Sequence, residues 1–347
     1  MDKRMGCAHL ASPRDAVWLC GCDHRRVSAH RCAKLDRASN PQGHATRRYS
    51  WPVACRAHRF VILILLTIGA GGGGRLLVFL TCAAGIAPAL LKSKNKRNYF
   101  FIVLLLGLSI ANVLTHTYSE EDAELSALGI RIALAIIIMM IVIIGGRVIP
   151  FFTERPLGLS IPRKPPLEKA ALLTSIIALG ADAAELSSIA AGVACLAAGF
   201  VNGWRLSGWQ SLRTVKTPLL WVLHLGYGWI VVGFVIKGLE LLGVDVPAIA
   251  ATHAFTAGGI GVLTLGMMAR VSLGHSGRPL AVGKAMMMVF AAINLAAFCR
   301  VFGIWLFPSL TMRFLEASSA LWLIAFAIYV VVYAPILLRP RLDGKDG

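Results

Sequence analysis

Long apolar runs recur along this chain, and they constrain its fold more than any other feature. A charge-poor run of about 17 to 25 residues matches the length of an α-helix that crosses the hydrocarbon core of a bilayer. Eight runs are clear, at 99–116, 129–148, 168–182, 187–203, 218–242, 249–271, 282–307 and 317–338, with a weaker one at 76–91 and a short fragment at 60–68. Backbone polar groups in lipid must be bonded within their own segment, so these runs predict helices. The expected fold class is all-α, a polytopic integral membrane helix bundle of about 9–10 transmembrane helices.

The loop charges predict the orientation of the bundle. The chain carries 35 Lys and Arg against 17 Asp and Glu, a net charge of +18. Basic residues fall on every second connection, beginning with 92–98, whereas 118–125 is acidic. The positive-inside rule therefore puts the basic loops and the C-terminus in the cytoplasm. Because these charges are spread over separate loops, we expect the lipid bilayer as a partner and no nucleic acid.

The stretch from Ala250 to Leu280 is the one around which the bundle is expected to form. At about 100° per residue one face of its helix is small and polar. That face comprises His253, Thr256, Ala257, Gly261 and Thr264, and Met267 and Met268 continue it, while Phe255, Val262 and Leu273 lie opposite. Polar groups in lipid need partners and small residues allow close approach, so this face should turn toward other helices.

Three further histidines are candidates for function. His116 follows Asn112 by four residues at the end of its helix, either as an interfacial residue or as a ligand. His224 lies about two turns inside its span, either as a ligand or as a structural hydrogen-bond partner of Tyr227. His275 lies in the loop that follows the 249–271 span.

Helical rise limits which of these residues can share a metal. Met267 lies about 21 Å along the axis from His253. Thioethers suit Cu(I), but a site at Met267 or Met268 would have to take its histidine from His275 or His224. No C-x-x-C-H sequence occurs, so covalent haem is excluded.

Other polar and small residues have plain structural interpretations. Arg300, inside an apolar run, is expected to face the bundle. Ala191, Cys195 and Gly199 are four residues apart and predict a close helix contact. Asp182 and Glu185 are interpreted as solvated charges of a tight turn, and Arg205 is counted among the loop charges.

Residues 1–58 differ from the remainder, 59–347, which is the transmembrane domain. They hold eleven Lys and Arg, four Asp and Glu, five of the eight cysteines and five of the nine histidines, without a helical or strand period. The C-x-C-x-H spacing at Cys20–His24 does not fit the usual paired zinc ligands. Our hypothesis is a disordered or out-of-frame segment, with the true sequence resuming near Phe60. The glycine-rich run 69–75 is interpreted as a linker.

Three segments in a fixed order carry a family resemblance. They are GGRVIPFFTERPLG at 145–158, TPLLWVLHLGYGWIVVGF at 217–234 and HAFTAGGIGVLTLGMMARVSLGHSGRPL at 253–280. Together they resemble the NnrS family, over roughly Phe60 to the C-terminus. Members of that family are bacterial polytopic membrane proteins described as containing haem and copper and linked to nitric oxide metabolism. Its N-terminal W-H-x-H-E-M-like motif is not found in this sequence.

The resemblance implies noncovalent haem and copper as cofactors, nitric oxide as a partner, a role in denitrification or nitrosative stress protection, and the bacterial inner membrane as location. It implies His116, His224 and His253 as haem ligands and Arg147 as a propionate contact, although snorkelling or pairing with an acid also explains Arg147. The implied metal ligands are His253, His275, His224, Met267 and Met268. Two alternatives stay open: a secondary transporter, and an inactive fragment with structural histidines. Whether the chain catalyses a reaction is equally open.

Overall fold

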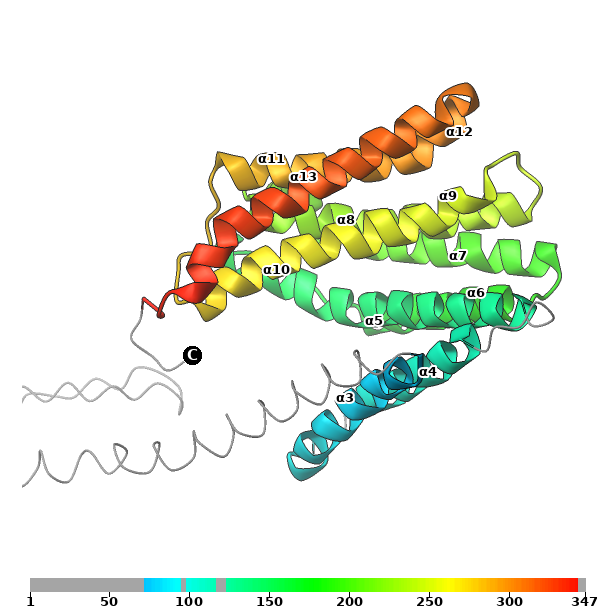
Figure 1. Ribbon diagram of the computed structural model, residues 1–347, viewed down its shortest axis with the longest axis horizontal. Coiled ribbons are helices and arrows are strands. Elements are labelled where there is room, and N and C mark those ends of the chain that lie inside the picture. Colours follow the sequence, from blue (N-terminus) through cyan, green and yellow to red (C-terminus); the bar gives the residue numbers. More distant parts are fainter. Residues whose placement is uncertain (1–71, 95–97, 117–122, 343–347) are drawn as a thin grey trace, which may run out of the picture. The chain divides into compact units, whose positions relative to one another are not determined.

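The computed structural model describes residues 72–94, 98–116 and 123–342 (Figure 1). They belong to one compact unit that spans residues 66–347. The predictions made for residues 1–58 and for the segment around Phe60 fall outside the described residues, and they stay predictions.

The described residues form nine continuous helices and no strand, which confirms the all-α fold class. Two of the nine contain a π-helical segment. The uninterrupted helices are α3 (Gly72–Lys92), α4 (Phe100–His116), α5 (Ala123–Leu157), α6 (Pro165–Ala183), α7 (Ser188–Ser207), α8 (Pro218–Leu241) and α13 (Thr311–Leu338). Between α8 and α13, α9 (Ala248–His253) continues through the π-helix η4 (Ala254–Ile260) into α10 (Gly261–His275). The next helix, α11 (Lys284–Phe298), continues through the π-helix η5 (Cys299–Gly303) into α12 (Ile304–Leu306). Short 3-10 turns, η3 (Ser211–Thr214) and η6 (Pro308–Leu310), precede α8 and α13.

Six of these helices are long and apolar enough to cross a membrane, so the chain is a multi-pass membrane protein. They are α5, α7, α8, α9–α10, α11–α12 and α13. The 35 residues of α5 exceed the predicted span 129–148 at both ends and include Pro150, which is buried. The interpretation of 69–75 as a linker is wrong for its second half, because the backbone is already helical from Gly72.

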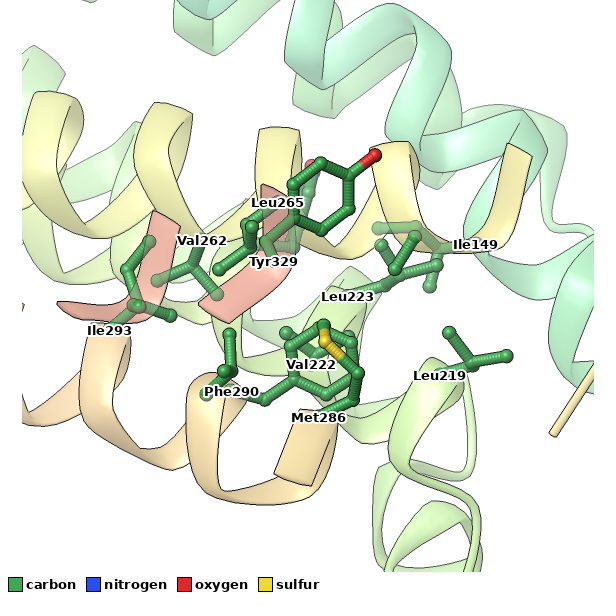
Figure 2. Close-up of a cluster of buried hydrophobic side chains, with 14 of the residues drawn as sticks. Ile149, Leu219, Val222, Leu223, Val262, Leu265, Met286, Phe290, Ile293 and Tyr329 are labelled. Atoms are coloured by element: carbon green, nitrogen blue, oxygen red, sulfur yellow. The ribbon is translucent and has the colours of Figure 1, made fainter. Parts of the chain in front are cut away.

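Helix α8 lies at the centre of the bundle. It contacts α5, α7, the α9–α10 helix and α11. Pro218 opens it at a position where a missing N–H costs nothing. Figure 2 shows the largest buried cluster, in which Leu219 and Val222 of α8 pack with Val262 of α10 and Phe290 of α11.

Glycines allow neighbouring helices to approach α8 closely. A Cβ added at Gly199 of α7 would lie 2.8 Å from Val235, and one at Gly233 would lie 2.6 Å from Phe255. Ala191 and Cys195 are fully buried along the same line of α7. The predicted close packing of 191–199 is therefore confirmed.

A series of contacts brings one set of helix ends together. Ser126 at the start of α5 donates to the carbonyl of Thr115 (3.0 Å), which precedes His116. Arg131 of α5 pairs with Glu185 in the α6–α7 turn (2.5 Å). Asp182, at the end of α6, pairs with Lys237 of α8, whose end leads into α9. His116 and His253 therefore lie at the same end of the bundle, as expected.

Candidate functional site

The helix that carries His253 changes its winding directly after this residue. Residues Ala254–Ile260 form the π-helix η4, and the π-helix η5 packs against it from the neighbouring helix. Such wide turns inside α-helices occur frequently at functional sites. Glycines let α8 pack closely against this turn, since a Cβ at Gly258 would lie 2.5 Å from Trp229 and one at Gly259 2.2 Å from Ile230.

The predicted small polar face lines a cavity of about 670 Å³ between η4–α10 and α13. Thr256, Ala257, Gly261 and Thr264 all contribute to its wall, so four of the five members of the predicted face lie together. His253 precedes them by one turn and is half-buried. The opposite face packs into the bundle, as the burial of Val262 shows.

Arg300 of η5 brings a positive charge to the same cavity. One of its terminal nitrogens donates to the Ser319 hydroxyl over 3.4 Å, a long hydrogen bond. Its Nε is buried without a hydrogen-bond partner in the described part of the chain. The expectation that Arg300 faces the bundle is confirmed.

Two of the candidate histidines have rings that form no hydrogen bond with the described residues. The described residues give neither His116 nor His253 a hydrogen bond, and His116 is exposed at the last position of α4. One turn before His116, the side-chain oxygen of Asn112 is buried and also lacks a partner within the described ranges. Both imidazoles are thus chemically available as ligands at this end of the bundle.

His224, in contrast, is held on both ring nitrogens. Its Nε2 lies 2.9 Å from the Thr153 hydroxyl and its Nδ1 lies 2.8 Å from the Ser211 hydroxyl. The Thr153 hydroxyl already donates to the Ile149 carbonyl, so we assign the ring proton to Nε2 and let Ser211 donate to Nδ1. As a metal ligand, His224 would have to give up one of these bonds. Its role as a ligand stays a prediction, and the geometry favours the structural alternative.

The prediction that Tyr227 is the hydrogen-bond partner of His224 was wrong. Its neighbour on the helix, Tyr227, directs its hydroxyl to Asn202 (2.6 Å) and accepts from Arg205 (3.0 Å). Trp209 lies between the two rings, with centroid distances of 6.3 Å to His224 and 4.7 Å to Tyr227. The aromatic ring therefore separates two polar clusters that the sequence suggested were one.

Arg205 anchors the second cluster, and its assignment as a loop charge was wrong. Its side chain is only 3% exposed and pairs with Glu168 of α6. It also donates to the carbonyl of Val142 on α5 (2.9 Å). Gly146 leaves the space that the guanidinium occupies, since a Cβ there would lie 1.6 Å from its terminal nitrogen. The missed signal was the spacing of Arg205 from Asn202 and Ala198, which lie on the buried face of α7.

Acidic residues at the other end of these helices are also paired. Lys237 lies 3.2 Å from Asp182 and 3.4 Å from Glu240. With the Arg131 pair of Glu185, ion pairs surround the connection between α6 and α7. The interpretation as a solvated charge holds for Glu185, whose side chain is 69% exposed, and is wrong for Asp182, which is half-buried against Lys237. The pairs were not visible in sequence because the partners come from α5 and α8.

The remaining candidates lie apart from one another. Met267 packs against the core and the next residue, Met268, is exposed, while His275 is exposed at the end of α10. His275 is about 12 Å from Met267 along the axis and about 33 Å from His253. Arg147 stacks on Phe100 of α4, 5.7 Å from the ring centroid. Among the described residues no three His, Cys, Asp or Glu side chains gather closely enough to hold one metal ion. The assigned roles of these residues stay predictions.

These features define a polytopic helical membrane protein with uncommitted histidines at one end of its bundle and a paired arginine network nearer the other. The family model described as NnrS protein matches residues 42–341, and the chain belongs to this family. The match begins upstream of Phe60, where the family resemblance was expected to start. No curated protein and no solved structure matches the chain.

Proposed function

We propose that this protein is a haem- and copper-binding protein of the bacterial inner membrane that acts in nitric oxide metabolism or in protection against nitrosative stress. Family membership supports this proposal. The observation that carries it in the structure is the contrast between the histidines: His224 is held by two hydroxyls, whereas the rings of His116 and His253 have no partner among the described residues. His253 is half-buried, and an unpartnered polar group at such a position is costly, so a ligand accounts for it; His116 is exposed, and its ring is accessible to the same ligand.

The residues at the His253 end fit a noncovalent haem. A histidine that holds haem iron needs a free ring nitrogen, which both His253 and His116 would offer. We propose that these two residues would hold the haem iron. Arg147 lies about 24 Å along α5 from Arg131, toward the other end of the bundle, so its role as a propionate contact stays what the family resemblance implies and is not part of this site. The uncommitted oxygen of Asn112 can accept a hydrogen bond one turn from His116.

The copper proposal rests on the family and on residue chemistry. Met267, Met268 and His275 supply the soft thioether and imidazole ligands that Cu(I) prefers, although 12 Å of helix separates Met267 from His275. His253 cannot complete the same site from the opposite end of its helix. When bound, haem and copper supply the redox and nitric oxide chemistry, and the protein supplies their orientation.

The loop charges support a cytoplasmic C-terminus. The loops that follow α5 and α10 carry Arg163, Lys164 and Arg278, and the chain after α13 carries Arg339. Basic residues next to membrane spans are retained on the cytoplasmic side. His116 and His253 are then near the periplasmic face.

An optical spectrum with metal analysis on the purified full chain tests this function. We expect a Soret band that shifts when nitric oxide is added to the reduced protein. His253→Ala should weaken the band, while His275→Ala, at the opposite end of the same helix, should leave it unchanged and lower the copper content. Folded protein that holds neither haem nor copper would refute the proposal and favour structural histidines.

A further inference from the structure

The cavity beside η4 combines a mostly apolar wall with a single cationic group. Trp322 and Phe326 of α13 form one side, with their ring centroids 4.1 Å apart. Its volume of about 670 Å³ is in the range of small-molecule sites, roughly 300–1,000 Å³. A small inorganic ion would leave most of this space unfilled, so the occupant must have an apolar body.

The cavity's own hydroxyls do little for Arg300. In the described part of the chain, the hydroxyls of Thr256 and Ser318 bond to the carbonyls of Thr252 (2.7 Å) and Ala296 (2.8 Å), and neither forms a hydrogen bond with Arg300. Ser319 accepts from Arg300 only over 3.4 Å. Within the described residues Arg300 forms no ion pair, and its Nε is buried without a partner. A guanidinium inside a membrane span needs an anionic or carbonyl partner, and the ligand must bring it.

The depth and the opening of the cavity indicate how the ligand enters. Arg300 lies six residues before the end of α12, about 9 Å along the axis, which places it below the membrane surface near the His253 end. Leu323 is 67% exposed and Trp322 is 38% exposed on the side of the bundle. In a membrane-spanning helix this side faces lipid, so the cavity is open to molecules dissolved in the bilayer.

We propose that this cavity binds an amphipathic carboxylate, with Arg300 pairing its carboxylate and the Trp322–Phe326 wall holding its apolar body. Two sources offer this chemistry: a fatty acid of the bilayer and the propionate edge of a haem. The inference is independent of the haem proposal, because it follows from the residues of the cavity and is met by either source.

Fluorescence of Trp322 provides the test. The full chain is placed in nanodiscs of phosphatidylcholine and titrated with 9,10-dibromostearic acid, whose bromines quench a tryptophan that they touch. The contribution of Trp322 is the part of the quenching that is lost when the same titration is carried out on the Trp322→Phe variant. The methyl ester of the same acid is the uncharged control. We expect the acid to quench at a concentration roughly tenfold lower than the ester, as the loss of one charged hydrogen-bonded pair predicts.

Arg300→Gln should remove this preference, raising the half-saturation point of the acid about tenfold and leaving that of the ester unchanged. Arg313→Gln, at an exposed position near the start of α13, removes the same charge and should change neither. Gly261→Leu, which fills the cavity, should abolish quenching by both compounds and serves if Arg300→Gln does not fold. Thermal unfolding of each variant verifies that it is folded.

A parallel titration with haemin and haemin dimethyl ester distinguishes the two sources. An Arg300-dependent preference for dibromostearic acid alone identifies a lipid carboxylate, and one for haemin alone identifies a propionate. Equal affinity for acid and ester in both titrations, or no effect of Arg300→Gln in either, overturns the proposal. Neither result changes the outcome expected for the Soret band of His253→Ala, so the two proposals fail separately.

Discussion

The substitution Gly146→Ala tests the arginine network most directly. The added Cβ would lie 1.6 Å from a terminal nitrogen of Arg205 and 2.2 Å from its guanidinium carbon. A flexible side-chain end can often move aside at little cost, but this one is buried and held by Glu168, by the Val142 carbonyl and by the Tyr227 hydroxyl. The guanidinium must therefore leave its partners to make room.

The cost can be estimated from those partners. Breaking a buried ion pair destabilises a protein by about 3–5 kcal/mol. Glu168 is 29% exposed and can recover some hydration, which favours the lower end of that range. Alanine in place of glycine inside a helix returns about 1 kcal/mol. We expect a net loss of about 2–3 kcal/mol, measured as the free energy of unfolding in a mild detergent titrated with SDS.

Gly180→Ala is the matched control, because Gly180 is also helical and a Cβ there would meet nothing within 4 Å. It should stabilise the protein by about 0.5–1 kcal/mol. In an Arg205→Met background the atoms that clash are absent, so Gly146→Ala should lose its cost. If Gly146→Ala is as stable as Gly180→Ala, or if its cost persists without the guanidinium, the assignment of Gly146 as the space for Arg205 is refuted.

Two further substitutions probe the other polar contacts. Thr153→Val leaves the ring N–H of His224 buried without its acceptor and should lower the free energy of unfolding by about 1–3 kcal/mol in the same titration, whereas an unchanged value would mean that this hydrogen bond is not formed. Lys237→Met leaves Asp182 and Glu240 facing each other without the ammonium between them, and because all three are partly exposed we expect a loss of only about 0.5–1 kcal/mol that shrinks in high salt. A loss that does not respond to salt would indicate that the aliphatic stem of Lys237, not its charge, stabilises this end of α8.

The membrane fold was predictable because its signals are local. Length and apolar composition within each segment identify a spanning helix, and no partner segment is needed to recognise it. The same applies to the small polar face of the His253 helix, since residues spaced three and four apart share a face whatever packs against them. Even there, no local pattern indicated the π-helix η4, or that its glycines leave room for Trp229 and Ile230 of α8.

Pairing between distant charges was not predictable. Arg205 and Glu168 lie 37 positions apart, and each looks in sequence like a solvated charge at the end of a span. Only the packing of α5, α6, α7 and α8 places them together, next to a glycine that has no signal of its own. The same reason explains why the ion pairs of Asp182 and Glu185 were not predicted.

The sequence by itself determined that this chain crosses a membrane many times as helices, that its histidines are few, and which family it resembles. Hydrophobicity, helical period and motif order are read from the chain itself, so they can be recognised without knowing which segments contact each other. Only the tertiary structure decided which histidines are hydrogen-bonded. Hydroxyls from two different segments bond to both ring nitrogens of His224, whereas none of the described residues forms a hydrogen bond with the ring of His253. It also decided that Arg300 faces a cavity, because a side chain's partners are set by which helices pack beside it.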